Sequence, residues 1–282
     1  MRLSYFPGCS LAGTAAEYDR SIRAVAAGLG VELVELADWS CCGASSAHMT
    51  DAELGIALAA RNLQLAAAAG LDLLVPCAAC FQRLRVADRA LRAEPQRWGL
   101  EAWQPDFGVI HLTRWLAQRE RLEQIGQLVS RPLAGLRLAC YYGCLSLRPA
   151  AVTGAPDAEQ PEGLDRLVAA LGAEPVRWSH KTECCSGSLT MARPDIARAL
   201  INDLLAAARR GGARAIVTDC PMCQANLESR QLDLLRAGPE APGLPVFFAT
   251  ELVAHALAAG EARKPWREHL VDPRPLLGEL EL

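Results

Sequence analysis

Ten of the eleven cysteines follow one spacing pattern that occurs twice along the chain. Each copy has a lone cysteine, then an adjacent pair, then a C-x-x-C motif. In both copies 34 residues (43–76 and 186–219) separate the pair from the C-x-x-C motif, whereas the arm between the lone cysteine and the pair has 31 residues in the first copy and 39 in the second. Soft thiolate ligands that repeat in register indicate a metal-binding protein. The ten residues are Cys9, Cys41, Cys42, Cys77, Cys80, Cys144, Cys184, Cys185, Cys220 and Cys223.

The number of thiols in each copy bears on which metal they hold. One tetrahedral zinc ion takes four ligands, so five thiolates suit a cluster of several iron atoms better. Structural zinc in one domain, buried unreactive thiols and a disulfide framework remain as alternatives. The disulfide framework is disfavoured because the N-terminus lacks the apolar segment of a secretory signal, and thiols stay reduced in the cytoplasm.

Composition predicts a soluble protein with a large core. The chain has 282 residues, of which 51% are hydrophobic, and this is enough for one large core or two ordinary ones. Its 29 basic and 32 acidic residues give a formal net charge of −3 and are dispersed, which argues against a nucleic-acid partner. The longest apolar stretch, 63–75, is interrupted by Gly70 and Asp72 and is too short to cross a bilayer. We therefore expect no transmembrane segment and a cytoplasmic location.

The repeat extends beyond the cysteines and predicts the α/β class. Short apolar strands are expected at 3–7, 71–75 and 109–113, and their counterparts at 138–142, 214–218 and 246–250. Strands that alternate with helices predict βαβ units, so we expect two tandem domains, 1–131 and 132–282, each with a small, mostly parallel sheet flanked by helices. The predicted helices are Ala15–Leu29, Asp51–Ala69, Pro194–Arg210 and Glu251–Ala259.

Two further features concern the ends of these elements. Thr113 and Thr250 follow predicted strands and are expected to be the N-caps of the next helices. The segment from Lys264 to Leu282 contains proline and is expected to pack over the surface.

The predicted strands also explain why the cysteines are spaced as they are. Ligands of parallel α/β units collect at the carboxyl ends of the strands. Cys9 and Cys144 each follow a strand directly, and each C-x-x-C motif lies between a strand and the start of a helix. The positive end of a helix lowers the pKa of a thiol there, which suits metal ligation.

The complete pattern resembles the cysteine-rich CCG domain, and nearly the whole chain resembles HdrB, the cysteine-rich subunit of heterodisulfide reductase. The resemblance implies two CCG domains related by a pseudo-twofold axis, with one noncubane 4Fe-4S cluster per domain held by the five cysteines of that domain. It further implies that a disulfide substrate is cleaved, or formed, between the two clusters. The segments that carry the resemblance are 5–9, 38–44, 142–144, 181–185 and 219–227.

The chain departs from the methanogen-type pattern at three positions near the cysteines. Tyr141 and Leu145 stand where histidine is usual, and Ser186 follows the second pair where glycine is usual. These differences put a coenzyme M–coenzyme B heterodisulfide in doubt as the substrate. A bacterial sulfur-oxidising complex that resembles heterodisulfide reductase acts on lipoate-bound sulfur. We therefore consider membership of such a complex as a second hypothesis for this chain, with a lipoate-binding protein as a partner.

Residues near the cysteine loops are candidates for proton transfer or substrate contact. We predict catalytic roles for Tyr141, Tyr142, His180 and Lys181, of which Lys181 would attract an anionic substrate. His48 is a further candidate. Cys140 has no counterpart in the first copy, where Tyr5 stands, and is predicted to be a core thiol; His111 aligns with Phe248 and is predicted to face the core.

Partners follow from what the chain does not contain. It has no flavin or nicotinamide motif, because Gly28-Leu29-Gly30 fits the end of a helix, and it has no ferredoxin-type cysteine run. The resemblance implies two electron partners, an HdrC-like protein with ferredoxin-type iron–sulfur clusters and an HdrA-like flavoprotein. Two other functions remain open. The chain could be an electron-transfer adaptor of a dehydrogenase, like the cysteine-rich domains of some succinate, glycerol-3-phosphate and lactate dehydrogenases, or it could be a structural zinc protein. The direction of electron flow is open as well.

Overall fold

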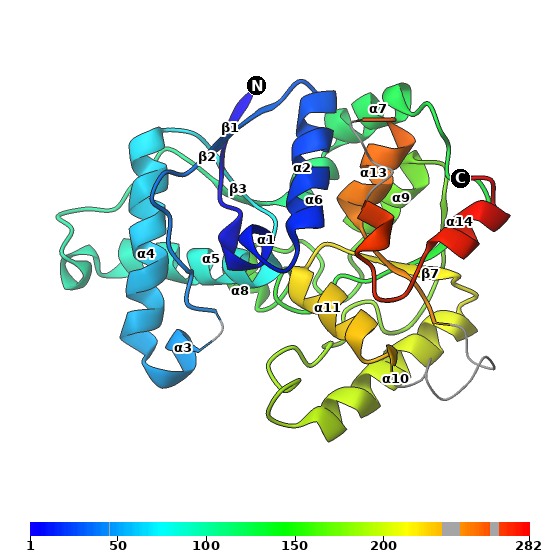
Figure 1. Cartoon of the computed structure of the whole chain (residues 1–282). Helices are drawn as coiled ribbons and strands as arrows, with labels where there is room; N and C mark the ends of the chain where they lie inside the picture. The colour runs from blue at the N-terminus through cyan, green and yellow to red at the C-terminus, as the bar shows by residue number, and fades with distance from the viewer. Residues whose placement is uncertain (45, 233–242, 260–264) are drawn as a thin grey trace.

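The computed structural model describes residues 1–44, 46–232, 243–259 and 265–282. They form two four-stranded parallel sheets with helices around them (Figure 1). The α/β class and the two repeated sheets are therefore confirmed. Division of the chain between residues 131 and 132 stays a prediction.

The first sheet has the strand order β2-β1-β3-β4, and every neighbouring pair is parallel. The strand β3 is buried along its whole length, as expected of a central strand covered on both faces. Its elements, in chain order, are β1 (Arg2–Tyr5), α1 (Gly8–Ala12), α2 (Ala16–Gly28), β2 (Glu32–Glu35), α3 (Ala47–Thr50), α4 (Ala52–Ala69), β3 (Leu73–Val75), α5 (Ala78–Ala93), η1 (Pro95–Trp98), β4 (Val109–His111), α6 (Leu112–Leu116) and α7 (Arg119–Leu128).

The second sheet repeats this order as β6-β5-β7-β8, again with parallel neighbours only. The equivalent strands occupy equivalent places in the two sheets, which is what a duplicated domain requires. Its elements are β5 (Arg137–Cys140), α8 (Ala150–Thr153), α9 (Gly163–Ala170), β6 (Glu174–Pro175), α10 (Pro194–Arg210), β7 (Ala215–Thr218), α11 (Pro221–Ser229), β8 (Val246–Phe248), α13 (Ala249–Ala256), η2 (Pro265–Arg267) and α14 (Arg274–Glu279).

Local sequence explains where the longest helix of the first domain begins and ends. The Asp51 side chain accepts hydrogen bonds from the backbone N–H groups of Glu53 and Leu54 and so caps α4. The helix ends where Gly70 adopts the left-handed conformation. Both ends lie within one residue of the predicted helix Asp51–Ala69.

The two domains exchange helix contacts across their boundary. The helix α13 packs on α2 of the first domain, and α9 packs on α6 and α7. One hydrophobic cluster accordingly contains buried residues of both domains, such as Tyr18, Trp115 and Phe247. The two halves therefore share a core, although each has its own sheet.

The two predicted threonine caps are wrong. The helices α6 and α13 begin earlier than expected, with His111 and Phe248 as their N-cap residues. Both threonine hydroxyls instead reach the other domain, because Thr113 donates a hydrogen bond to Asp219 and Thr250 lies 2.7 Å from the Ser21 hydroxyl.

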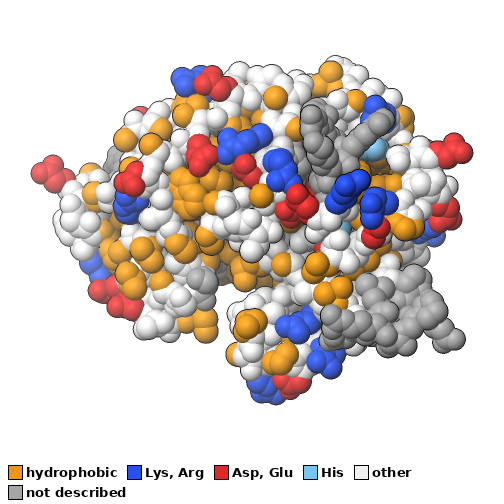
Figure 2. Space-filling model, viewed as in Figure 1, with side chains coloured by type: hydrophobic (Ala, Val, Ile, Leu, Met, Phe, Trp, Pro, Cys, Tyr) orange, Lys and Arg blue, Asp and Glu red, His pale blue; other side chains and the backbone are white. Residues whose placement is uncertain are grey.

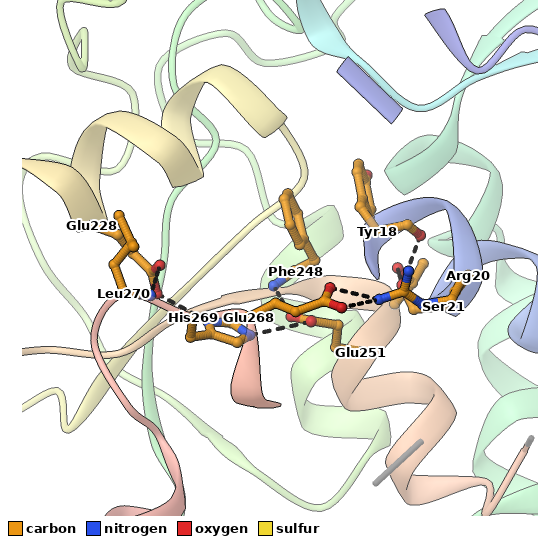
Figure 3. A network of polar contacts seen from close by, with 10 residues as sticks. Tyr18, Arg20, Ser21, Glu228, Phe248, Glu251, Glu268, His269 and Leu270 are labelled. Carbon is orange, nitrogen blue, oxygen red and sulfur yellow. Dashed lines mark hydrogen bonds and ion pairs between the residues drawn. The ribbon is translucent and has the colours of Figure 1, made fainter. Parts of the chain in front are cut away.

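The segment 265–282 packs on the second domain, and a buried charged network holds it there (Figure 3). His269 Nδ1 lies 2.9 Å from Glu228 Oε1 on α11, and its Nε2 lies 3.2 Å from Glu251 Oε1 on α13. Burial alone lowers the pKa of His269, but the hydrogen bonds to the two carboxylates outweigh it and raise the pKa to about 10. A buried imidazolium between two carboxylates thus joins this segment to α11.

Candidate metal centres

The C-x-x-C motifs lie where the strands predict them. Cys77 follows β3 and is the N-cap residue of α5, and Cys220 follows β7 and is the N-cap residue of α11. Cys80 and Cys223 lie in the first turns of these helices and are buried. All four thiols are therefore at helix N-termini, where backbone N–H groups and the helix dipole favour negative charge.

The five thiols of the first copy form a connected set. Cys42 Sγ lies 3.2 Å from Cys80 Sγ, and Cys80 also interacts with Cys77. Cys9 interacts with Cys41 and Cys42 from the start of α1. The backbone N–H of Gly43 lies 3.4 Å from Cys41 Sγ.

The second copy repeats these contacts. Cys185 Sγ lies 3.4 Å from Cys223 Sγ, Cys223 interacts with Cys220, and Cys144 interacts with Cys184. The backbone N–H of Ser186 lies 3.2 Å from Cys184 Sγ, in the place that Gly43 takes in the first copy. Ser186 has a φ of 57°, a conformation in which glycine would be unstrained.

The two sets meet at the domain boundary. The Cys77 thiol interacts with the Cys220 thiol, although 142 residues lie between them in the sequence. Their helices start from strands at equivalent positions of the two sheets. The ten thiols thus form one array that spans both domains.

The glycine before each lone cysteine makes room for the array. Gly8 and Gly143 have φ values of +71° and +64°. A Cβ added at Gly8 would lie 3.0 Å from Cys80 Sγ, and one added at Gly143 would lie 3.1 Å from Cys223 Sγ. Both the backbone conformation and the close approach of a thiol therefore require glycine.

Contacts between thiols favour ionisation of one partner. The hydrogen bond from Cys80 lowers the pKa of Cys42 to about 7, and that from Cys144 lowers the pKa of Cys184 to about 6. The pKa of each donating thiol is raised in turn. Thiolate is the form that binds metal, so part of each set is prepared for ligation near neutral pH.

A cavity of about 510 Å³ opens beside the second set, and we call it the cysteine cavity. All five cysteines of the second copy line it. Its other wall comes from α3 and α5 of the first domain, with His48, Met49 and Arg83 among its residues. In Figure 2 a notch separates the surface over α3 from the surface over α10, and charged side chains are dispersed over the rest of this face.

The donor set fits iron in a cluster. Every candidate ligand is a thiol, and each copy supplies five of them, one more than a tetrahedral ion takes. In the described part of the chain, which includes all ten cysteines, no three Cys, His, Asp or Glu side chains are arranged around a single ion. The sulfur–sulfur contacts join the thiols in pairs, Cys42 with Cys80 and Cys185 with Cys223.

Of the other predicted site residues, the structure brings Tyr142 and Lys181 together, because both bond to Asp165 and Lys181 Nζ lies 5.3 Å from the centre of the Tyr142 ring. Tyr141 is fully buried beside the second thiol set, and its hydroxyl donates to the Glu183 carbonyl at 2.7 Å. Tyr142 lines the cysteine cavity, but its hydroxyl donates to Asp165. His180 contacts Ser179 and does not line the cavity.

Lys181 is engaged elsewhere. Its Nζ lies 3.1 Å from both Asp165 carboxylate oxygens and 2.9 Å from the Pro161 carbonyl, and its side chain is 13% exposed. Among the described residues, it is therefore Arg83 that brings a cation to the cysteine cavity. Gln82 Oε1 holds the Arg83 guanidinium, at 3.0 and 2.6 Å. The sequence signal for Arg83 was its position three residues after Cys80, on the same face of a helix.

Two predicted core residues are placed as expected. Cys140 is fully buried at the end of β5, and burial raises its pKa. His111 is 1% exposed, with Nδ1 3.7 Å from Asp219 Oδ2.

Comparison with known proteins agrees with this geometry. The model of the cysteine-rich domain family named CCG matches residues 3–85 and 138–228, which contain both thiol sets. The chain belongs to the CCG cysteine-rich domain family. No helix in the described ranges is both long and apolar enough to cross a membrane.

Two relatives of this CCG protein are named as parts of different enzyme complexes. A Wolinella succinogenes protein, "8-methylmenaquinol:fumarate reductase membrane anchor subunit", is 31% identical over 97% of this chain and 98% of its own length. The HdrB protein of a CoB-CoM heterodisulfide reductase from Methanosarcina acetivorans is 27% identical over 91% of this chain and 89% of its own length. The expected similarity to HdrB is thus confirmed.

A solved structure of a hypothetical protein from Helicobacter pylori has the same fold. It is 11% identical, with a TM-score of 0.69 over 96% of this chain. The chain spans about half of that longer protein, 52%.

Proposed function

We propose that the chain is the iron–sulfur protein of a heterodisulfide reductase-like complex and that a disulfide is cleaved, or formed, in the cysteine cavity. The observation that carries the proposal is the lining of this cavity by all five second-copy cysteines, opposite residues of the first domain. The contact between Cys77 and Cys220 supports it, because it places the two thiol sets next to each other.

The two sets would each hold one noncubane 4Fe-4S cluster. The first set is Cys9, Cys41, Cys42, Cys77 and Cys80, and the second is Cys144, Cys184, Cys185, Cys220 and Cys223. When bound, the clusters would supply the two electrons that cleavage of an S–S bond consumes.

The side chains of the cavity have separate tasks. Leu145 and Met222 give it a partly buried apolar wall that suits a flexible thioether or alkyl chain. Arg83 would bind an anionic group of the substrate, the task predicted for Lys181. His48 would exchange protons with the released thiol, whereas the Tyr142 hydroxyl is engaged with Asp165, so its ring would contribute only packing to the cavity wall.

The substrate that we propose is linked to sulfur oxidation. Leu145 lies in the cavity wall where the methanogen-type pattern has histidine, which makes that wall more apolar. A lipoate-bound sulfur would suit such a wall, and a lipoate-binding protein would then deliver it. The proposed electron partners are an HdrC-like protein with ferredoxin-type clusters and an HdrA-like flavoprotein, and the proposed location is the cytoplasm.

A second function is favoured by the relative from Wolinella succinogenes. At 31% identity over 97% of this chain, a protein named as the membrane anchor of a fumarate reductase is more similar than the HdrB relative. On this alternative the chain would be an adaptor that passes electrons between a dehydrogenase or reductase and its partner, and the cysteine cavity would bind no disulfide.

Metal analysis followed by EPR separates these functions. We expect about eight irons and eight sulfides per chain, and a new paramagnetic signal when a thiol is added to the oxidised protein. Iron and sulfide without a signal from any thiol, dihydrolipoamide included, would favour the adaptor. Zinc without sulfide would overturn both.

A further inference from the structure

Two buried asparagine side chains bind the loops that carry the adjacent cysteine pairs. The chain has only three asparagines, Asn62, Asn202 and Asn226. Asn62 of α4 is 0% exposed and Asn226 of α11 is 6% exposed, so each brings a polar amide into the interior. A buried amide is costly unless it is hydrogen-bonded, so the partners of these two side chains indicate their role.

Asn62 binds the residue that precedes the first pair. Its Oδ1 accepts a hydrogen bond from the Ser40 backbone N–H at 2.9 Å, and its Nδ2 donates to the Ser40 carbonyl at 2.9 Å and to the Leu58 carbonyl at 3.1 Å. Both backbone polar groups of Ser40 are therefore bonded to one side chain of α4. Because Cys41 and Cys42 follow directly, this amide fixes the point at which the pair begins.

Asn226 binds the second pair itself. Its Nδ2 donates to the Cys185 carbonyl at 3.0 Å, and its Oδ1 accepts from the Thr190 hydroxyl at 2.6 Å. Arg230, the C-cap residue of α11, donates to the Thr190 carbonyl at 2.8 Å. Asn226 and Arg230 thus hold both ends of the loop 185–190, which lines the cysteine cavity.

The two asparagines do not occupy equivalent positions of the repeat. Because 34 residues separate each pair from its C-x-x-C motif, the two copies align here without gaps. Leu205 stands where the first copy has Asn62 (42 to 62 and 185 to 205), and Arg83 stands where the second copy has Asn226 (80 to 83 and 223 to 226). Each copy therefore has one asparagine of this kind, at the place where the other copy has none.

The side chains at the two exchanged positions have other tasks. Arg83 lines the cysteine cavity and its guanidinium is held by Gln82 Oε1, so it does not bind the first pair as Asn226 binds the second. The amide for the first pair comes from α4 instead. Leu205 is 0% exposed and packs in the hydrophobic cluster that contains Cys185.

We propose that Asn62 and Asn226 are positioning residues, each of which fixes one cysteine pair in the place where its thiols bind metal. Asn62 acts on the first set and Asn226 on the second, because each amide bonds to the backbone of one cysteine loop only. The role in metal binding rests on the proposed function, whereas the hold on the two pairs does not.

Alkylation of the full chain by iodoacetamide, followed for each cysteine by peptide mass spectrometry, tests the hold on each pair. Cys42 and Cys185 are 2% and 4% exposed, so both should react slowly in the parent. Asn62→Ala should speed alkylation of Cys42 at least tenfold and leave Cys185 at the parent rate, and Asn226→Ala should do the reverse. A variant that is merely less stable would speed alkylation of both cysteines.

Iron analysis of the same samples tests the role in metal binding. Asn62→Ala and Asn226→Ala should each keep about half of the iron of the parent, because each releases one set of ligands. Parent iron contents in both variants would overturn this role. A parent without iron would contradict the proposed function, and the alkylation rates would still decide whether the asparagines hold the pairs.

Asn202→Ala is the matched control, because in the described part of the chain Asn202 Oδ1 has no hydrogen-bond partner. It should match the parent in both measurements. Thr190→Val removes a partner of Asn226 from a half-buried loop residue and should speed alkylation of Cys185 alone, which keeps the test decisive if Asn226→Ala does not fold. Parent rates in all variants, or equal acceleration of Cys42 and Cys185, would overturn the proposal.

Discussion

Removal of the His269 imidazole should destabilise the protein strongly. His269→Ala leaves Glu228 and Glu251 buried, at side-chain exposures of 1% and 0%, without their shared cation. Breaking a buried ion pair from one side costs roughly 3–5 kcal/mol. The pKa itself gives a similar figure, because a rise from 6.5 to about 10 corresponds to about 4–5 kcal/mol.

The same shift predicts how stability changes with pH. The pKa of His269 is raised in the folded state, so its contribution is complete below the unfolded value of 6.5 and is lost as pH rises through about 10. The free energy of unfolding of the parent protein should therefore fall between pH 7 and pH 10, and His269→Ala should remove this part of the decrease.

Urea unfolding monitored by circular dichroism, at several pH values, measures both effects. Arg20→Gln is the matched control, because Arg20 binds Glu268 of the same segment through a solvent-exposed ion pair, with side-chain exposures of 54% and 45% (Figure 3). An exposed pair contributes about 0–1 kcal/mol. If His269→Ala is no less stable than Arg20→Gln, the imidazolium is not what holds the segment.

Three further changes test the cysteine array. If the proposed ligand sets are right, Cys184→Ser should lose the proposed second cluster and all turnover, whereas Cys140→Ser should keep the iron content of the parent. Iron and sulfide analysis checks this, and equal iron contents in the two variants would contradict the ligand assignment. Gly143→Ala should destabilise the protein and lower its iron content, because the new Cβ would be in a strained backbone conformation and only 3.1 Å from a thiol sulfur. Gly30→Ala is the control, because Gly30 has a φ of +68° but open space around it; it should lose only the strain energy, about 1 kcal/mol of the free energy of unfolding in urea. Ser186→Gly should stabilise the protein by about 1 kcal/mol in urea unfolding, because it relieves the strain at φ 57°. An unfolding midpoint at or below that of the parent would contradict the strain argument.

Regular patterns of the sequence predicted the α/β class and three of the four strands of each sheet, but not the edge strands β2 and β6. The in-register repeat predicted two equivalent sheets, and the predicted helix Pro194–Arg210 coincides with α10 because Pro194 can begin a helix and Gly211 follows its last residue. The cysteine positions at strand ends followed from the general behaviour of parallel sheets.

Local pattern failed where the partner came from the other domain. Thr113 and Thr250 have the residue type of a helix cap, but Asp219 and Ser21 compete for their hydroxyls across the domain boundary. Within the second domain, Lys181 is near a cysteine pair in sequence but pairs with Asp165 of α9, a contact that sequence spacing does not predict. No local sequence pattern predicts the contact between Cys77 and Cys220, because this contact depends on how the two complete domains dock.

The shared core has a consequence for how the chain matures. The helices α2 and α9 are each covered by helices of the opposite domain, so a nascent first half would expose the faces of α2 and α6 that the second half later hides. We therefore expect iron insertion to wait until the ribosome has released both halves, and a gene split near residue 131 to yield two polypeptides that acquire metal only when they are co-expressed.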